Sequence, residues 1–400
     1  MNENGACVGA LRVSEYKSMR VLVTYSLVGR GGDAVQVQEI AQALRNLGHN
    51  VQVLGPTSLR PYDFSTKEGR LRNLARRLPW WARDCIELTL QWRLSRTVKK
   101  ILAKEHFDLV FHRASIYDFV GARLAQMTTT PVVAHLDAPF ATERAFHGLG
   151  HFAALHKHCM RRLGQSVRLV LTVSAASKDY YVKLGIPEEK ILIMPNGISS
   201  ELLKVGIELT KARPPFSDPR VCTIGFVGSL SRWHRVDLLL EALRELGAPQ
   251  DPRWQVKIVG FGEEYHRLRA LAREYRLEKC IAWLGALPHE QAFREIAEFD
   301  IVILPHTLST GAPLKLFEYA ALARPTIAPD LPNLRALFSE EEMCFVKPEN
   351  PKAIAKAIEE LTDDPERARR VGLKAQDRVK KEYTWEKILG RVLEEVFKCG

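Results

Sequence analysis

Residues 19–56 read MRVLVTYSLVGRGGDAVQVQEIAQALRNLGHNVQVLGP and carry four consecutive structural signals. An apolar, β-rich run (MRVLVTYSL) is followed by a glycine-rich loop (VGRGGDA), a helical segment (VQVQEIAQALRNLGHN) and a second β-rich run (VQVLGP). The helical segment repeats apolar residues at helical spacing and meets a stop signal at Gly48. A strand, a loop, a helix and a strand in this order predict a parallel, doubly wound α/β sheet.

The same rhythm fills the first half of the chain and restarts after a break. Prolines and charges interrupt it at residues 205–220, which we interpret as a linker. We therefore expect two Rossmann-like domains that face a cleft, residues 19–204 and 221–383. A disordered lead-in (residues 1–18) and a terminal helix (residues 384–400) complete the chain. The later β-rich runs are FDLVFHR, PVVAHLDAP, RLVLTVS and KILIMPNG, then VCTIGFVGSL, WQVKIVGFG, IAWLGAL and DIVILP.

Composition narrows the class of protein. The 400 residues are too many for one ordinary core, and 46% hydrophobic with 26% charged residues is typical of a soluble globular protein. No apolar run approaches the roughly 20 residues of a membrane-spanning helix. The first residues lack the apolar core of a signal peptide, and translation starting at Met19 is an alternative to a disordered lead-in. The seven cysteines form no CxxC or Cys/His cluster, so we expect neither disulfides nor zinc, in a cytoplasmic protein.

The net charge of +11 and the pI near 9.3 require an anionic partner. Nucleic acid, phosphate-bearing small molecules and an anionic membrane surface all qualify, but no nucleic-acid-binding motif is present. The stretch SLRPYDFSTKEGRLRNLARRLPWWARD favours a peripheral contact with the inner face of the cell membrane, because cations seek anionic headgroups and tryptophans settle at the interface. A solvated face with partly buried tryptophans is the alternative. The side chains concerned are Arg60, Lys67, Arg70, Arg72, Arg76, Arg77, Arg83, Trp80 and Trp81.

The first glycine-rich loop has two interpretations. Gly29, Gly31, Gly32 and Ala34 nominally satisfy the G-x-G-x-x-A fingerprint of NAD-binding loops. That fingerprint needs an acidic residue at the end of the next strand, and this strand ends VQVLGP without one. We therefore favour a loop whose backbone amides approach an anion at a helix N-terminus.

The segment FVGSLSRWHRVDLLLEAL is the corresponding loop of the second half. Gly228 permits a tight turn, and hydroxyl and cationic side chains crowd the helix start beyond it. Guanidinium groups pair with phosphate oxygens in bidentate fashion, so a phosphate site is one interpretation and a solvated basic turn is the other. The side chains concerned are Ser229, Arg232, His234 and Arg235.

A third loop precedes the helix in GAPLKLFEYAALARPTIAP, residues 311–329. Pro313 fixes a turn and Gly311 allows close backbone approach. The amides near Leu314 and Lys315 are free at the helix start, where an anion is welcome, and Lys315 adds a full charge. Glu318 lies one turn into the helix. Its carboxylate either accepts two hydroxyl hydrogens from a ribose or is a solvated glutamate favoured by the helix dipole.

Several segments in this order resemble glycosyltransferase family 4, which comprises retaining enzymes of the GT-B fold. They are TVSAASKDYYVKLGIPEEKILIMPNGI, GFVGSLSRWHRVDLLLEA, VKIVGFGEEYHRLRALA, WLGALPHEQAFREIAEFDIVILP, PLKLFEYAALARPTIA and YTWEKI. The resemblance runs from Met19 to the C-terminus and is most specific from Ser174 onward. It implies an N-terminal domain that binds the acceptor and a C-terminal domain that binds a nucleotide-sugar. It also implies that the helix after YTW crosses back onto the N-terminal domain.

The resemblance implies roles for the third loop. Glu318 matches the second glutamate of the family's E-x7-E motif, which binds the nucleotide ribose. The first glutamate would fall at Thr310 and is missing. The backbone of Gly311, Ala312 and Pro313 is then expected to meet the sugar and the phosphate.

It also implies the remaining donor contacts. His234 stands at the place of the family's diphosphate-binding lysine and Ser229 at that of its arginine. The available substitute cations are Arg232, Arg235 and Lys315. Further donor contacts are Gly260, Gly262, Leu287 and Pro288 near the base, with Gly31 and Gly32 at the diphosphate.

The acceptor side is less regular. In VVAHLDAPFATER, His135 and Asp137 are two residues apart, so both point to one face of the strand. Many family members carry a histidine where Asp137 falls, and both residues are candidates for contacts near the reacting sugar. A structural histidine is the alternative for His135. Arg113 and Glu143 match polar positions of the same family variant.

These residues predict a retaining transferase that moves a sugar from a UDP- or GDP-sugar to a hydroxyl of a glycan or lipid-linked acceptor. We expect no cofactor and no metal, because the chain has no D-x-D motif to hold a cation against the diphosphate. A nucleotide-sugar hydrolase or epimerase of the same fold is one alternative. The departures at Thr310, Ser229 and His234 leave a catalytically silent nucleotide-sugar-binding protein as another.

Overall fold

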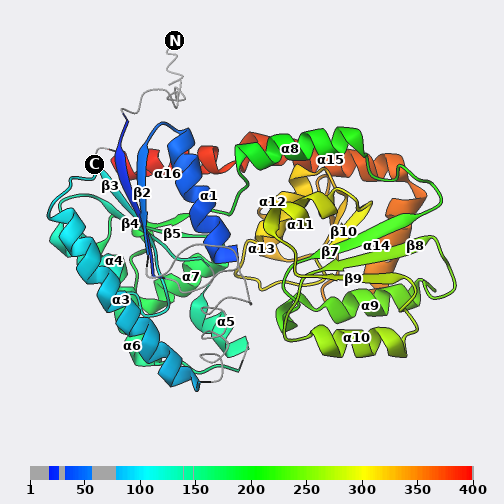
Figure 1. Cartoon of the computed structure of the whole chain (residues 1–400), viewed down its shortest axis with the longest axis horizontal. Helices are drawn as coiled ribbons and strands as arrows, with labels where there is room; N and C mark the ends of the chain where they lie inside the picture. The colour runs from blue at the N-terminus through cyan, green and yellow to red at the C-terminus, as the bar shows by residue number, and fades with distance from the viewer. Residues whose placement is uncertain (1–17, 27–31, 56–77, 138, 147, 399–400) are drawn as a thin grey trace, which may run out of the picture.

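The structure is a computed structural model that describes residues 18–26, 32–55, 78–137, 139–146 and 148–398. Two six-stranded parallel sheets, each flanked by helices, lie one after the other along the longest axis of the molecule (Figure 1). This arrangement confirms the predicted pair of doubly wound sheets.

The first sheet has the strand order β2-β1-β3-β4-β5-β6. Because β3 pairs with the other edge of β1, the chain reverses its direction of growth between β1 and β3. Its strands are β1 (Arg20–Tyr25), β2 (Asn50–Leu54), β3 (Leu109–Arg113), β4 (Val132–His135), β5 (Leu169–Thr172) and β6 (Ile191–Ile193). Its helices are α1 (Gly32–Asn46), α3 (Trp80–Leu102), α4 (Val120–Met127), α5 (Phe140–Phe146), α6 (Ala153–Ser166) and α7 (Ala175–Leu184).

The second sheet has the order β12-β11-β10-β7-β8-β9 and reverses between β7 and β10. Its strands are β7 (Cys222–Val227), β8 (Trp254–Val259), β9 (Ile281–Gly285), β10 (Ile301–Ile303), β11 (Thr326–Pro329) and β12 (Cys344–Val346). Its helices are α9 (Val236–Glu245), α10 (Tyr265–Glu274), α11 (His289–Ile296), α12 (Leu314–Ala321), α13 (Pro332–Arg335), α14 (Pro351–Asp363) and α15 (Pro365–Glu382). Ligands of doubly wound sheets bind beyond the carboxyl ends of the strands at such a reversal, so the loops after β7 and β10 are the first place to look for a site.

The carboxyl edges of the two sheets meet. The Ser174 hydroxyl, just after β5, donates a hydrogen bond of 2.7 Å to the carbonyl oxygen of Thr310, in the loop after β10. Asn196, just after β6, donates one of 2.6 Å to the carbonyl oxygen of Ala312 in the same loop. A ligand bound at either edge therefore lies close to the other domain.

Two helices lie along one side of the molecule, one over each domain (Figure 1). α8 (Ser200–Ala212) packs on α12, and the Thr210 hydroxyl donates to the Leu322 carbonyl at 2.8 Å. The predicted irregular linker at residues 205–220 is therefore helical in its first half, because Ser199 caps α8 and the helix continues until Arg213 leaves helical geometry. The domain limits drawn from that linker stay a prediction.

The second of these, α16 (Trp385–Phe397), returns to the first domain and packs against α1. The Trp385 indole is fully buried and donates to Glu39 of α1 at 2.7 Å. Asn46, at the other end of α1, donates to Glu386 at 2.9 Å. One hydrophobic core accordingly runs through α1, α16, α11 and α12 and joins the two domains.

Candidate active site

The loop after β10 ends where α12 begins. Residues 310–313 are called the donor loop below. Pro313 is the N-cap of α12, with φ of −60°, and Leu314 is its first residue, so the helix start predicted from the sequence is confirmed. Lys315 and Glu318 lie in its first and second turns. The amides of a first turn have no partner within the helix and carry the positive end of the helix dipole.

The Lys315 ammonium does not extend into solvent. Its Nζ lies 3.1 Å from Nε2 of His234 and 4.5 Å from the centre of the Phe226 ring. Gly228, with φ of 149°, makes this position available, because a Cβ atom there would lie 2.2 Å from Nζ. Burial lowers the pKa of Lys315 to about 7, against the opposing effect of the Glu318 carboxylate. The site therefore holds an amine that gains a proton readily when an anion approaches.

His234 orients this amine. Its Nδ1 is 2.6 Å from the Ser229 carbonyl oxygen, which can only accept, so Nδ1 carries the hydrogen and Nε2 is the acceptor that faces Lys315. Burial, and next the charge of Lys315, lower the pKa of His234 well below its ordinary value. The neutral imidazole adds no charge for a diphosphate, and a direct donor contact of His234 or Ser229 stays a prediction.

The two predicted substitute arginines already have carboxylate partners. Arg232 is largely exposed and lies 3.6 Å from Glu264. Arg235 lies 3.1 Å from Asp237 and 3.5 Å from Glu349. Lys315 lies in the first turn of α12 itself, whereas Arg232 and Arg235 are paired with carboxylates of other elements.

Glu318 has a partner that the sequence did not suggest. His289, the first residue of α11, donates from Nε2 to Oε1 of Glu318 at 2.6 Å, and this bond raises the pKa of His289. Glu39 of α1 lies within electrostatic range of both, and burial raises its pKa to about 7. A histidine directly after the predicted base-side Pro288 was the one sequence signal for this contact. Glu318 keeps a second carboxylate oxygen for a ligand.

The predicted glycines bring two loops together. Gly260 has φ of 138°, and a Cβ atom there would lie 1.8 Å from the Gly228 carbonyl oxygen; one on Gly262 would lie 2.4 Å from that of Leu230. Gly311 is different, since a Cβ atom there would meet only the Leu308 carbonyl oxygen, at 3.6 Å, and otherwise open space. Gly31 lies outside the described residues, and Gly32 begins α1.

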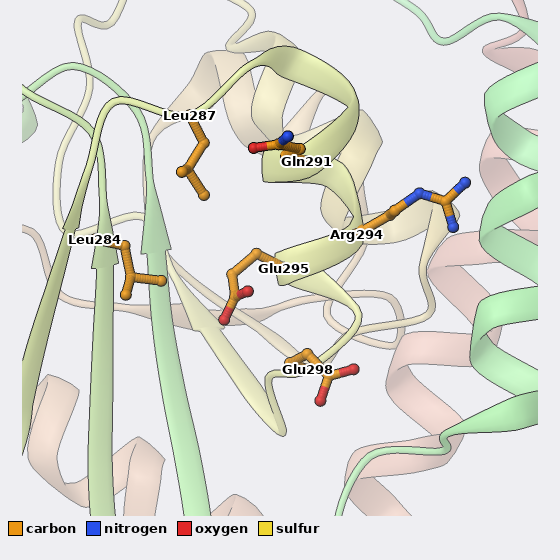
Figure 2. Close-up of a pocket in the computed structure, with 6 residues that line it drawn as sticks. All are labelled: Leu284, Leu287, Gln291, Arg294, Glu295 and Glu298. Atoms are coloured by element: carbon orange, nitrogen blue, oxygen red, sulfur yellow. The ribbon is translucent and has the colours of Figure 1, made fainter.

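Leu287 also lines an open groove between β9 and α11, shown in Figure 2. The groove combines Leu284 and Leu287 with two carboxylates, Glu295 and Glu298. Gln291 and Arg294 line the groove as well, and the carboxylates of Glu295 and Glu298 pair with Lys257 and Arg213, so its lining is mixed in charge. The predicted base contacts of Leu287 and of Pro288, which is exposed at the N-cap of α11, stay predictions.

The acceptor-side candidates separate into exposed and buried residues. Arg113 ends β3, is 1% exposed and donates to the Asp137 carboxylate at 3.1 Å. Asp137 keeps 24% of its side chain exposed, and Glu143 is half-buried on α5. His135 is fully buried against Phe111, and neither ring nitrogen has a hydrogen-bond partner within the described part of the chain. Burial, and next the Arg113 charge, lower its pKa well below the ordinary value. The His135 ring is thus closed off from solvent, and its predicted contact near the reacting sugar stays a prediction, whereas the Asp137 carboxylate is partly exposed.

The position of Lys315 gives a test of stability. Gly228→Ala should lower the free energy of unfolding by more than the roughly 1–2 kcal/mol of a left-handed alanine, because the new methyl group also displaces the Lys315 ammonium. Gly48→Ala is the matched control, since Gly48 also has a positive φ but its missing Cβ would meet nothing within 4 Å. Urea denaturation measures both; equal losses would show that Gly228 does not make room for Lys315.

Comparison with known proteins agrees with this geometry. Residues 211–378 match the model of the glycosyl transferases group 1, and residues 30–202 match that of glycosyltransferase family 4. A glycogen synthase of Mycobacterium tuberculosis is 25% identical over an alignment of length 399 that covers 92% of each chain. The amylovoran biosynthesis glycosyltransferase AmsK of Erwinia amylovora is 26% identical over 261 residues, which are 63% of this chain and 62% of that one.

Solved structures show the same fold at low identity. Anabaena HepE in complex with UDP superposes with a TM-score of 0.67 and 17% identity, covering 94% of this chain and 99% of that one. Sucrose-phosphate synthase of Thermosynechococcus elongatus superposes with a TM-score of 0.69 and 17% identity, and the match again covers 94% of this chain and 99% of that one. The two family models span both sheets except β1, and they include the loops after β7 and β10. With its two doubly wound sheets meeting at their carboxyl edges, the chain belongs to the GT-B glycosyltransferases of family 4.

Proposed function

We propose that this glycosyltransferase moves a sugar from a UDP- or GDP-sugar to a hydroxyl of a glycan or lipid-linked acceptor, with retention of the anomeric configuration. The observation that carries the proposal is the start of α12, where the Lys315 amine and the Glu318 carboxylate lie one helical turn apart beside free amides. The amides and the amine suit a diphosphate, and the carboxylate suits ribose hydroxyls. The UDP complexes solved for HepE support a nucleoside diphosphate donor in this fold.

In the chemical step, negative charge develops on the diphosphate leaving group and must be stabilised. The bond between the anomeric carbon and the phosphate oxygen breaks, and its electron pair stays on the diphosphate. The acceptor oxygen forms the new bond on the same face and passes its proton to the departing phosphate. The dipole of α12 and the Lys315 ammonium stabilise the charge that develops there. This route needs no carboxylate nucleophile and, we propose, no metal or other cofactor.

Transfer distinguishes the proposal from its alternatives. A thermal-shift screen with UDP-, GDP-, ADP- and CMP-sugars identifies the donor, and product analysis with and without acceptor, in EDTA, identifies the reaction. We expect a glycoside product only with acceptor. Sugar release or isomerisation without acceptor would favour a hydrolase or epimerase, and donor binding without turnover would favour a silent binding protein. Activity that needs added magnesium or manganese would contradict metal independence.

Glu318 tests the donor site most sharply. Glu318→Gln keeps the volume but replaces one acceptor oxygen by a donor, so one ribose hydroxyl loses its bond. Loss of a hydrogen bond to a charged group costs about 1.5–3 kcal/mol, which weakens donor binding about tenfold to hundredfold. Calorimetry with the nucleoside diphosphate measures the affinity, and Glu290→Gln, on the exposed side of α11, is the control. Unchanged affinity would show that Glu318 does not hold the ribose.

Lys315 makes donor binding depend on pH. Its pKa is about 7 in the free protein, so at pH 8 the amine is mostly neutral. A diphosphate favours the ammonium and raises this pKa, so binding of UDP at pH 8 should take up protons, and the affinity should fall as the pH rises from 7 to 9. Calorimetry in buffers of different ionisation enthalpy measures the uptake. Lys315→Met should abolish it and Arg232→Met should not; the same uptake in Lys315→Met would contradict this role.

We also propose a peripheral membrane contact for the N-terminal domain. Most of the predicted basic stretch, from Arg60 to Arg77, lies outside the described residues, and Trp80 packs edge-on against Phe152 at 5.0 Å. The support comes from the outward side of α3, where Trp81 is 53% exposed and Trp92 43%. No helix of the described residues has the length and apolar content to span a bilayer. Further exposed residues of α3 include Cys85, Ile86, Thr89, Arg93, Arg96, Lys99 and Lys100.

Vesicle sedimentation tests this contact. The protein should sediment with phosphatidylglycerol vesicles at low salt but not with phosphatidylcholine vesicles, because the cations need anionic headgroups. The double variant Trp81→Ala/Trp92→Ala should lose most of this binding, whereas Phe261→Ala, which removes an equally exposed ring from the other domain, should not. Equal sedimentation of the double variant and the wild type would exclude α3 as the contact.

A further inference from the structure

A buried line of hydrogen bonds joins the two sides of the site. From Arg113, Nη2 donates to the Asp137 carboxylate at 3.1 Å and Nε donates to Oε1 of Gln36 at 3.0 Å. Nε2 of Gln36 then donates to Oδ1 of Asn196 at 2.5 Å. Nδ2 of Asn196 donates to the carbonyl oxygen of Ala312 at 2.6 Å. The line therefore starts at the acceptor-side carboxylate and ends on the donor loop of the other domain.

Each link comes from a different element. Gln36 lies in α1, Arg113 ends β3 and Asn196 follows β6, so packing of the whole first domain fixes their spacing. Gln36 and Arg113 are each 1% exposed, and Asn196 and Ala312 are each 4% exposed. Water cannot replace a broken link at this depth, and an unpaired buried polar group is costly.

The arginine sets the direction of the line. A guanidinium only donates, so Gln36 must present its oxygen to Arg113 and its amide nitrogen to Asn196. Asn196 accepts with its oxygen and is left with its nitrogen for the Ala312 carbonyl. Both amides thus have one permitted orientation, and a change at Asp137 alters the arginine on which both depend.

We propose that Gln36 and Asn196 are positioning residues that couple the Asp137 carboxylate to the donor loop. Neither needs to touch a substrate. Coupling of this kind is reciprocal. An acceptor that binds Asp137 restricts the motion of the donor loop, and a bound donor restricts the motion of the Asp137 side chain. The inference rests on the proposed function only in the names donor and acceptor.

Gln36→Glu removes the hydrogen bond from residue 36 to Asn196 and leaves the size of the side chain almost unchanged. The new carboxylate still accepts from Arg113 but cannot donate to Asn196, which must turn its amide and point an oxygen at the Ala312 carbonyl. Asn196→Ser is a second cut at the next link, should Gln36→Glu fail to fold. Gln42→Glu is the matched control, because it makes the same substitution on the exposed side of α1, where Gln42 bonds Asn46 of its own helix among the described residues.

Hydrogen–deuterium exchange of the ligand-free protein measures the coupling, whatever the donor is. The peptide spanning residues 306–318 should exchange severalfold faster in Gln36→Glu and in Asp137→Asn, and as in the wild type in Gln42→Glu. Asp137→Asn/Gln36→Glu should exchange no faster than Gln36→Glu alone, because both substitutions act through one line. An Asp137→Asn protein that exchanges like the wild type, or a double variant whose effects multiply, would overturn the proposal.

Binding of UDP gives the second readout. Asp137→Asn should weaken it severalfold in the wild-type background and leave it unchanged in the Gln36→Glu background, a pattern that simple loss of packing does not produce. Equal weakening in both backgrounds would also overturn the coupling. If the wild type binds no UDP, GDP or ADP, the proposed function fails, while the exchange measurement still decides the coupling.

Discussion

The site depends on one partly buried amine, that of Lys315. Lys315 is long enough to leave α12, pass under Gly228 and reach the face of the Phe226 ring, where a neutral His234 accepts it. An ammonium in such surroundings loses hydration, and the imidazole and the ring offset only part of that loss. The protein thus keeps a group whose charge is most stable when an anion is present. This constraint explains the glycine at residue 228, where a Cβ atom would collide with the amine.

The topology places the Lys315 amine next to the loops where ligands of doubly wound sheets bind. Each sheet reverses its strand order once, between β1 and β3 and between β7 and β10, and the loops at such points are free to diverge around a ligand. Arg113 lies at the first reversal, while His234 and the donor loop flank the second. The hydrogen bonds from Ser174 and Asn196 to the loop after β10 hold the two reversals on facing edges. The common core of α1, α16, α11 and α12 keeps them there.

Local patterns predicted most of the fold and part of the site. The alternation of β-rich runs and helices gave both sheets, and the turn before Leu314 gave the start of α12, because these features depend on neighbouring residues. The helical half of the expected linker was missed, since prolines and charges after Ala212 masked the capped segment before it. His289, Gln36 and Asn196 were missed for a different reason. Their partners are distant in the chain, and spacing holds no information on such contacts.

The contacts of the first domain with the donor loop determine which substitutions the loop tolerates. The hydroxyls of Ser174 and Ser177 both reach the carbonyl oxygen of Thr310, and Asn196 reaches that of Ala312. Hydrogen bonds to main-chain carbonyl oxygens do not depend on the side chains of the residues that carry them. The hydrogen bonds of Ser174, Ser177 and Asn196 therefore hold the path of the loop without depending on which side chain stands at residue 310.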